Sequence, residues 1–203
     1  MKKVLIIFDT RYGNTQRLAE AIAEGAREVK GTEAHLRRVE ITEPEVIIQQ
    51  NESWHKANEK FKAIPQVTLE EMAEADALIF GSPTRYGNMT ASMKKLFDST
   101  GRLWAENKLF GKAGAAFTST STPHGGNEMT LITMFMPMYH HGMIVVTPGY
   151  GDPALFAAGS PYGASSVSGP GADKPPTESD LKVARFLGHR VALVAQALSS
   201  IKT

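Results

Sequence analysis

The chain contains no cysteine among its 203 residues. This absence excludes thiolate nucleophiles, disulfide exchange and cysteine-ligated zinc or iron–sulfur centres. Any redox chemistry of this protein must therefore belong to a bound cofactor.

The sequence also lacks a charge excess and a long apolar run. Its 22 basic and 21 acidic residues give a net charge of +1, without the basic block typical of nucleic-acid binding. No uncharged apolar stretch reaches the ~18 residues that a membrane span requires. The first apolar run ends at Asp9 and is shorter than the ~7–15-residue core of a signal peptide. We therefore expect a cytoplasmic protein that binds no nucleic acid and does not insert into a membrane.

The sequence does contain a repeated alternation of strand and helix patterns. Residues 4–8 are a continuous apolar run, typical of a parallel strand that is buried on both faces. Residues 18–29 then carry apolar side chains at helical spacing, up to Gly31. Further strands are predicted at about 35–41, 77–81, 113–118 and 143–147, and helices after Thr68, at about 91–100 and 129–140, and from Thr177 to about Ser199. This α/β alternation predicts a doubly wound sheet of five parallel strands with helices on both faces.

We interpret residues 1–203 as a single domain with two insertions, at about 42–67 and about 149–176. Loops of this length in a compact domain are usually functional or disordered. The first insertion, which contains Trp54, could contact another subunit or be a mobile surface segment. The second is rich in glycine, proline and serine, and could be a lid or a partly disordered loop.

The letters T-R-Y-G-N occur twice, at residues 10–14 and 84–88, each time between a predicted strand and a predicted helix. Ligands of doubly wound sheets bind at such strand ends, and helix N-termini favour phosphate. The first copy has the side-chain donors Thr10, Asn14 and Thr15, but neither a lysine nor the glycine spacing of dinucleotide-binding loops. It therefore indicates a single terminal phosphate, or alternatively a capped helix start.

Two further loops add neutral donors and aromatic rings at the same edge of the predicted sheet. Pro83 and Thr84 should stiffen the second T-R-Y-G-N loop, and residues 118–127 are rich in hydroxyls and backbone amides. Tyr12 and Tyr86 could each serve only in packing, but together they offer faces for a flat ring. A flat ring with a polar edge and a phosphate tail describes flavin mononucleotide (FMN).

Several motifs resemble those of the flavodoxin-like NAD(P)H:quinone oxidoreductases of the tryptophan-repressor-binding-protein type. They are T-R-Y-G-N-T at 10–15, G-S-P-T-R-Y-G-N-M at 81–89, L-F-D-S-T-G-R-L-W at 96–104, H-H-G-M at 140–143 and S-P-Y-G-A-S at 160–165. The resemblance implies a flavodoxin-like sheet of strand order 2-1-3-4-5 and bound FMN, with NADH or NADPH as the co-substrate. It also implies a homotetramer in which a neighbour helps to close the site.

The same resemblance implies roles for individual residues. His141 matches a histidine near the flavin, Tyr12 a position associated with the nicotinamide, and Trp104 one that faces the electron-accepting substrate. The residues implied to bind FMN are Thr10, Arg11, Tyr12, Gly13, Asn14, Thr15, Pro83, Thr84, Arg85, Tyr86, Gly87, Asn88, Ser119, Thr120, Ser121, Thr122, Pro123, His124, Gly125, Gly126 and His141. His124 could be a proton donor or a solvated loop residue. We predict no metal at His140 and His141, because neither a carboxylate nor a further histidine accompanies them at ligand spacing.

We therefore expect an FMN-dependent enzyme that transfers a hydride from NADH or NADPH to the flavin and then two electrons to a quinone, by a ping-pong mechanism. A flavodoxin-type carrier of single electrons is the alternative, although such carriers tend to dock through strongly acidic faces. A third possibility is a regulatory partner of a repressor, with the flavin incidental.

Overall fold

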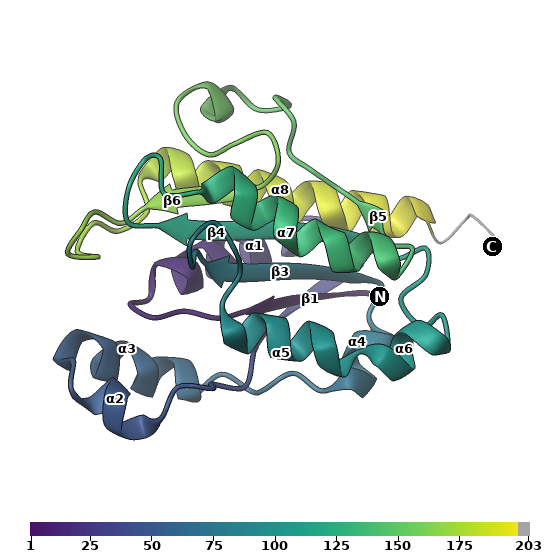
Figure 1. Ribbon diagram of the computed structural model, residues 1–203. Helices are drawn as coiled ribbons and strands as arrows, with labels where there is room; N and C mark the ends of the chain where they lie inside the picture. The colour runs from purple at the N-terminus through teal and green to yellow at the C-terminus, as the bar shows by residue number, and fades with distance from the viewer. Residues whose placement is uncertain (199–203) are drawn as a thin grey trace.

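The apolar runs form a parallel β-sheet in the computed structural model, which describes residues 1–198 (Figure 1). The strands are β1 (Lys2–Phe8), β2 (Thr32–Arg38), β3 (Ala77–Pro83), β4 (Ala113–Thr120), β5 (Ile144–Val145) and β6 (Ala164–Val167). Their order is β2-β1-β3-β4-β5, and β6 also pairs with β4. The predicted order 2-1-3-4-5 is thus confirmed, with β6 as an additional strand.

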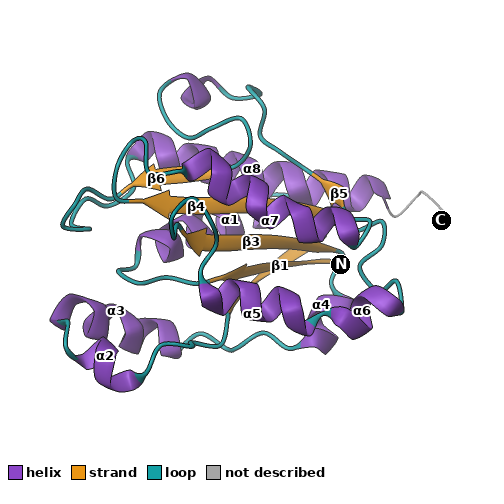
Figure 2. Cartoon of the chain, viewed as in Figure 1, coloured by secondary structure: helices purple, strands orange, loops and turns teal. Residues whose placement is uncertain are grey.

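Helices cover both faces of this sheet (Figure 2). They are α1 (Asn14–Arg27), α2 (Glu45–Gln49), α3 (Glu52–Lys62), α4 (Leu69–Glu74), α5 (Ala91–Ser99), α6 (Gly101–Ala105), α7 (Asn127–His140) and α8 (Glu178–Leu198), with a 3-10 turn, η1, at Pro153–Phe156. Residues of β1 alternate between two clusters: Val4, Ile6 and Phe8 pack with α1 and α8, whereas Leu5 and Ile7 pack with α5 and α7. A strand buried on both faces has no polar alternation, which explains its continuous apolar run.

The helix boundaries follow from capping. Thr68 and Glu71 form the predicted capping box at the start of α4, and the Thr177 hydroxyl accepts a hydrogen bond from the Asp180 amide at the start of α8. The end predicted for this helix at Ser199 lies outside the described residues. Within residues 1–198, no helix has both the length and the apolar character needed to span a membrane.

Two glycines set the contact of α1 with α8. A Cβ atom at Gly25 would meet the carbonyl of Arg185, and a Cβ atom at Gly188 would meet the carbonyl of Ile22. The two helices therefore pack backbone to backbone on one face of the sheet, which is possible only where no side chain intervenes.

The structure corrects two of the strand boundaries. β2 covers residues 32–38 and not the predicted 35–41, because its pairing with β1 starts at Lys2 and Thr32. The predicted strand at 143–147 is reduced to β5, whose two residues pair with the start of β4. The chain leaves the sheet after Val146, whose amide still donates to the Gly114 carbonyl, and Pro148 has no amide proton with which to resume the ladder.

The second predicted insertion contains β6. This strand pairs with the other end of β4, from Phe117 with Ala164 to Thr120 with Val167. The segment is therefore neither wholly a lid nor wholly a disordered loop, because residues 164–167 belong to the sheet. The sequence A-S-S-V hides this strand because it has no apolar run.

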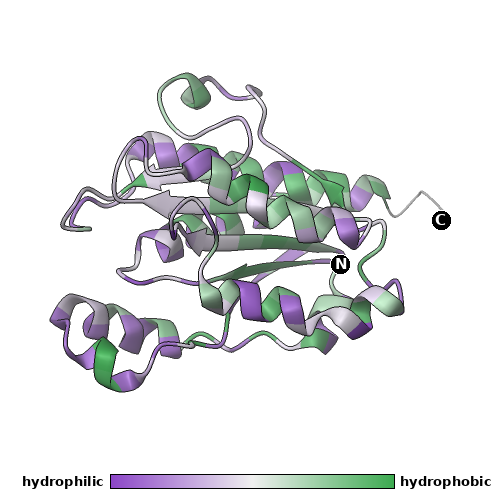
Figure 3. Cartoon of the chain, in the orientation of Figure 1, coloured by the Kyte–Doolittle hydropathy of each residue, from purple (hydrophilic) through white to green (hydrophobic). Residues whose placement is uncertain are grey.

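The first predicted insertion forms α2 and α3 beside the carboxyl ends of the strands, at the lower left of Figure 1. Most residues of α3 are hydrophilic (Figure 3), but Trp54, Asn58 and Phe61 are buried. The ring of Phe61 lies 5.4 Å from that of Phe8, measured between centroids. The end of α3 is thus anchored to the end of β1, where the first T-R-Y-G-N loop begins.

Candidate functional site

Three loops meet at the carboxyl ends of β1, β3 and β4. We call residues 10–14 the first TRYGN loop, residues 84–88 the second TRYGN loop, and residues 119–126 the third loop. They enclose a cavity of about 120 Å³. Its lining residues are Thr10, Arg11, Tyr12, Asn14, Thr15, Pro83, Thr84, Arg85, Ser119, Thr120, Ser121, Ser168 and Ala172. The structure thus brings together residues that were assigned to one ligand from separate parts of the sequence.

The first TRYGN loop leads directly into α1. Gly13 has a φ of 92° and is the N-cap of the helix, and it makes no side-chain capping bond. The Gly13 amide donates to the Thr10 hydroxyl at 3.0 Å, which tightens the turn. The first turn of α1 carries no acidic residue. Since the first amides of a helix have no partner within it, this helix start can bind an anion.

The second TRYGN loop closes on itself. The Arg85 amide donates to the Asn88 carbonyl at 2.7 Å and the Asn88 amide to the Arg85 carbonyl at 2.9 Å. Tyr86 has a φ of 53°, and its side chain is fully exposed. The helix that follows, α5, begins only at Ala91. Thr90 caps its start, because the Thr90 side chain accepts a hydrogen bond from the Met93 amide. This loop therefore offers an aromatic face but no open helix start.

Contacts hold the second TRYGN loop against the third loop. Gly126 has a φ of 91°, and a Cβ atom there would lie 2.8 Å from the Cα atom of Gly87. The hydroxyls of Thr130, on α7, and Thr84 lie 2.8 Å apart, within hydrogen-bond distance. The two loops consequently form one rigid rim, although Ser121, Thr122, Pro123 and His124 are exposed.

Two arginines bring positive charge to the cavity. Arg11 and Arg85 both line it, and among the described residues neither forms an ion pair with a carboxylate within 4.0 Å. Arg85 donates to the Thr84 carbonyl at 2.8 Å. The Nε atom of Arg11 is buried without a hydrogen-bond partner in the described part of the chain. Such an orphaned donor is costly, so Arg11 has unused hydrogen-bonding capacity beside the cavity that it lines.

Asp9 immediately precedes the first TRYGN loop and is buried. Desolvation raises the pKa of its carboxyl above the ordinary value, and a hydrogen bond with Thr90 opposes this rise. Glu43 adds to the rise, whereas Arg85 opposes it. Asp9 does not line the cavity, so its carboxyl interacts with Arg85 without touching a ligand there.

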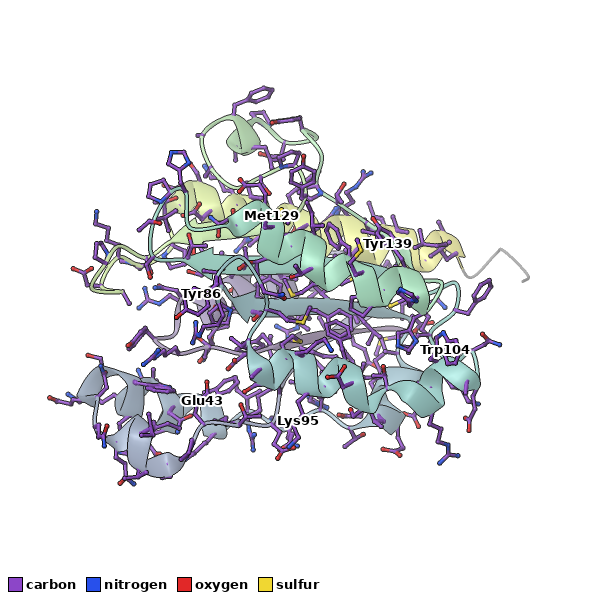
Figure 4. The ribbon with its side chains drawn as sticks, viewed as in Figure 1. Glu43, Tyr86, Lys95, Trp104, Met129 and Tyr139 are labelled. Atoms are coloured by element: carbon purple, nitrogen blue, oxygen red, sulfur yellow. The ribbon has the colours of Figure 1, made fainter. Side chains whose placement is uncertain are left out.

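His141 and Trp104 do not reach this cavity. His141 follows α7, whose 14 residues extend ~21 Å from the third loop. Trp104, on α6, is 58% exposed, and it lies at the opposite end of the molecule from Tyr86 (Figure 4). Neither residue can contact a ligand held in the cavity of its own chain.

The side chain of His141 is 8% exposed and lies 2.8 Å from the Thr100 hydroxyl through Nε2. That hydroxyl donates its single proton to the Phe97 carbonyl at 2.7 Å, so Nε2 carries the imidazole proton. Burial lowers the pKa of His141, and His140 lowers it further. The imidazole is thus held neutral, with Nδ1 as a buried acceptor that has no partner among the described residues.

Sequence reasoning missed the contribution of the chain after β6. Ser168 and Ala172 line the cavity, and the Ser168 amide donates to the Thr120 carbonyl at 2.8 Å. The run of small residues at 168–172 was the available signal, but only the pairing of β6 with β4 brings it to the site.

A second cluster of chemical groups lies outside the cavity, on α2 and α3. Glu45, His55 and Glu59 have ligand atoms within 4.8 Å of one another. The ammonium of Lys62 donates to Glu45 at 2.8 Å and to Glu59 at 3.4 Å. The cluster is therefore explained as an ion-pair network that joins the two helices.

The chain matches the sequence profile of the NADPH-dependent FMN reductases over residues 2–151. It belongs to this family. It is 46% identical over 200 residues to an NAD(P)H dehydrogenase (quinone) of Archaeoglobus fulgidus, and the alignment covers 98% of this chain and 100% of the relative. A protein of the same name from Syntrophobacter fumaroxidans is 43% identical, and that alignment covers 97% of this chain and 98% of the relative.

Solved structures agree with this assignment. The WrbA-like flavodoxin from Agrobacterium tumefaciens superposes with a TM-score of 0.69 at 26% identity, covering 97% of this chain and 99% of that one. The oxidised flavodoxin 1 of Bacillus cereus has a TM-score of 0.60 at 17% identity, covering 94% and 97%. The latter likeness concerns the fold alone, which is flavodoxin-like in both.

Proposed function

We propose that the protein is an FMN-dependent NAD(P)H:quinone oxidoreductase. The observation that carries this proposal is the meeting of three strand-end loops on a cavity with an open helix start and two arginines without carboxylate partners. The family match and the shared name of the relatives support the same activity. FMN, when bound, would accept a hydride from NADH or NADPH and pass two electrons to a quinone in a separate half-reaction.

The first TRYGN loop would hold the phosphate of FMN. The first amides of α1, together with the hydroxyls of Thr10 and Thr15, supply neutral donors, and Arg11 and Arg85 add charge. Three charge-assisted hydrogen bonds contribute roughly 5–9 kcal/mol gross, against the ~8 kcal/mol of micromolar affinity. Because binding also has ordering costs, the arginines and the loops that line the ring must add to this contribution.

The ring of the flavin would lie at the rim. A cavity of about 120 Å³ is smaller than the ~300–1,000 Å³ of ligand sites, so it can enclose only the phosphate end. The second TRYGN loop and the third loop then line the ring with backbone amides, and amides fixed in advance stabilise negative charge on it. Tyr12 and Tyr86 offer faces to the nicotinamide and the ring.

A second copy of the chain would complete the ring site. Trp104 and His141 cannot serve their own cavity, but Trp104 is exposed and could face the quinone in a neighbour's site. The outer face of α7 exposes Met129, Met136 and Tyr139, an apolar surface of the kind found at interfaces (Figure 4). Tetrameric assembly and a cytoplasmic location remain predictions.

The test begins with the purified protein. We expect a yellow chromophore that releases FMN on denaturation, and steady oxidation of NADH or NADPH that depends on added benzoquinone. Protein reconstituted with FMN that is reduced but never reoxidised by benzoquinone would contradict the enzymatic proposal. Accumulation of one-electron-reduced flavin without turnover of NADH would instead support the single-electron carrier.

A further inference from the structure

The α2–α3 segment contacts the first TRYGN loop through a ring. The guanidinium carbon of Arg11 lies 4.0 Å from the centroid of the Trp54 ring and 5.3 Å from that of Tyr12. Trp54 is 6% exposed. A cation within ~6 Å of an indole face is attracted to it, and more strongly where water is excluded.

Arg11 lies between two cavities and lines both of them, as do Thr10 and Arg85. On one side is the cavity assigned to the phosphate, and on the other a cavity of about 10 Å³ next to Trp54 and Asn58. The carboxyl groups of Asp9 and Glu43 border the smaller cavity, but neither forms an ion pair with Arg11 within 4.0 Å. The guanidinium of Arg11 is therefore held against a ring and forms no direct ion pair with a carboxylate.

Whether a ring or a carboxylate holds Arg11 affects how well the arginine can bind an anion. An arginine side chain loses about 2 kcal/mol of rotamer entropy when it is fixed, so a residue that fixes it beforehand favours binding. A carboxylate could fix it too, but would cancel the charge that a phosphate needs. The indole face fixes the guanidinium and leaves its charge and its hydrogen-bond donors available.

We propose that Trp54 is a positioning residue which holds Arg11 at the phosphate end of the cavity, so that the α2–α3 segment favours FMN over unphosphorylated riboflavin. The inference rests on the proposed function, because it takes FMN as the ligand. It gives the first insertion a role within a single chain, which does not depend on contact with another subunit.

The test compares the dissociation constants of FMN and riboflavin for the apoprotein, measured by quenching of flavin fluorescence. Trp54→Leu is expected to weaken FMN binding about five- to tenfold and riboflavin binding less than about twofold. We call the affinity for FMN divided by the affinity for riboflavin the FMN-to-riboflavin ratio. Trp54→Phe, which keeps an aromatic face, should lower this ratio about twofold. In an Arg11→Leu background the Trp54→Leu change should have no further effect on that ratio, because coupled residues are not additive.

Phe61→Leu is the matched control on the same helix. It removes a buried ring that packs on Phe8 but does not touch Arg11, so it should lower the Tm and change both dissociation constants by the same factor. If Trp54→Leu also weakened both flavins equally, Trp54 would be merely structural and the inference overturned. Should Trp54→Leu not fold, an unchanged ratio in Trp54→Phe would overturn it.

The wild-type protein separates this inference from the proposed function. Wild-type apoprotein that binds neither flavin would refute both. Wild-type protein that binds FMN and reduces benzoquinone, with an unaltered FMN-to-riboflavin ratio in the Trp54 variants, would refute the role of Trp54 alone.

Discussion

The two TRYGN loops have the same five residues and different structures. In the first, α1 begins inside the motif at Asn14, with Gly13 as an N-cap that makes no side-chain capping bond. In the second, the motif closes a turn between Arg85 and Asn88, and α5 begins later, capped by Thr90. The first loop leaves the first amides of α1 open to a ligand, whereas the helix that follows the second loop is capped within the protein.

The residues after each motif explain this difference. The first copy continues into T-Q-R-L, which can extend a helix at once, and the second into M-T-A-S, where the threonine is a favoured N-cap. A capped helix start has satisfied amides, so it attracts an anion less than an open one. The same letters therefore predict a phosphate site only in the first copy.

The strongest test of this comparison changes the same letter in both copies. Asn14→Asp places a carboxylate on the cavity beside the proposed phosphate, and we expect FMN affinity to fall about 100-fold, or about 2.7 kcal/mol. Asn88→Asp should change the affinity less than about threefold, because the Asn88 side-chain oxygen only accepts from the Met89 amide and a carboxylate does so equally. Flavin fluorescence titration measures both, and equal losses would refute the comparison.

The next largest effect concerns the rigid rim. Gly126→Ala adds a Cβ atom 2.8 Å from the Gly87 Cα atom in a backbone conformation that L-residues disfavour. We expect the free energy of unfolding to fall by about 2–3 kcal/mol. Gly13→Ala, at a similar φ but with no atom within 4 Å of the added carbon, should lose only about 1 kcal/mol. Urea denaturation measures both, and a larger loss at Gly13 would contradict this account of the rim.

A smaller effect comes from strain at Tyr86. Because this residue has a φ of 53° and a fully exposed side chain, Tyr86→Gly should stabilise the apoprotein by about 0.5–1 kcal/mol while raising the KM for NADH. Tyr12, the matched residue of the first copy, is partly buried and has no positive φ. Tyr12→Gly should therefore destabilise the apoprotein, as thermal unfolding can verify. Destabilisation by Tyr86→Gly would show that the ring has packing partners in the assembled protein.

The smallest expected effect is a pH dependence of the folding stability. It comes from the residue before the first copy, Asp9, because the residue before the second copy, Pro83, does not ionise. Since the pKa of Asp9 is raised on folding, its carboxyl favours the folded state only at low pH, and this contribution is lost as the pH rises through the folded pKa. The stability of Asp9→Asn relative to wild type should thus be greater at pH 7 than at pH 4. Chemical denaturation at both pH values measures the difference, and the opposite trend would mean that the hydrogen bond with Thr90, together with Arg85, outweighs burial.

Much of the fold is predictable from sequence because buried parallel strands are continuous apolar runs. The run at 4–8 and the capping box at Thr68 each predict their element directly. β6 is not predictable in this way, because Ala and Ser carry no strand periodicity and its pairing depends on β4. Its position is a property of the tertiary structure.

Some features of the candidate site could likewise be predicted from the sequence, and others could not. The loop residues could be assigned because a doubly wound sheet brings successive strand ends together. The contact of Arg11 with Trp54 could not be predicted, since it joins the first loop to a residue of the first insertion that lies 43 positions later in the chain. Nor does the sequence show that His141, which follows α7, and Trp104, on α6 beyond α5, both lie away from their own cavity.

A crystal structure of the FMN complex would test the central claim most directly. The account predicts that phosphate oxygens lie within about 3 Å of the first backbone amides of α1, with the Arg11 guanidinium between the phosphate and Trp54 and the flavin ring beside residues 84–88. A phosphate bound at the second TRYGN loop, or a flavin held away from the start of α1, would contradict it.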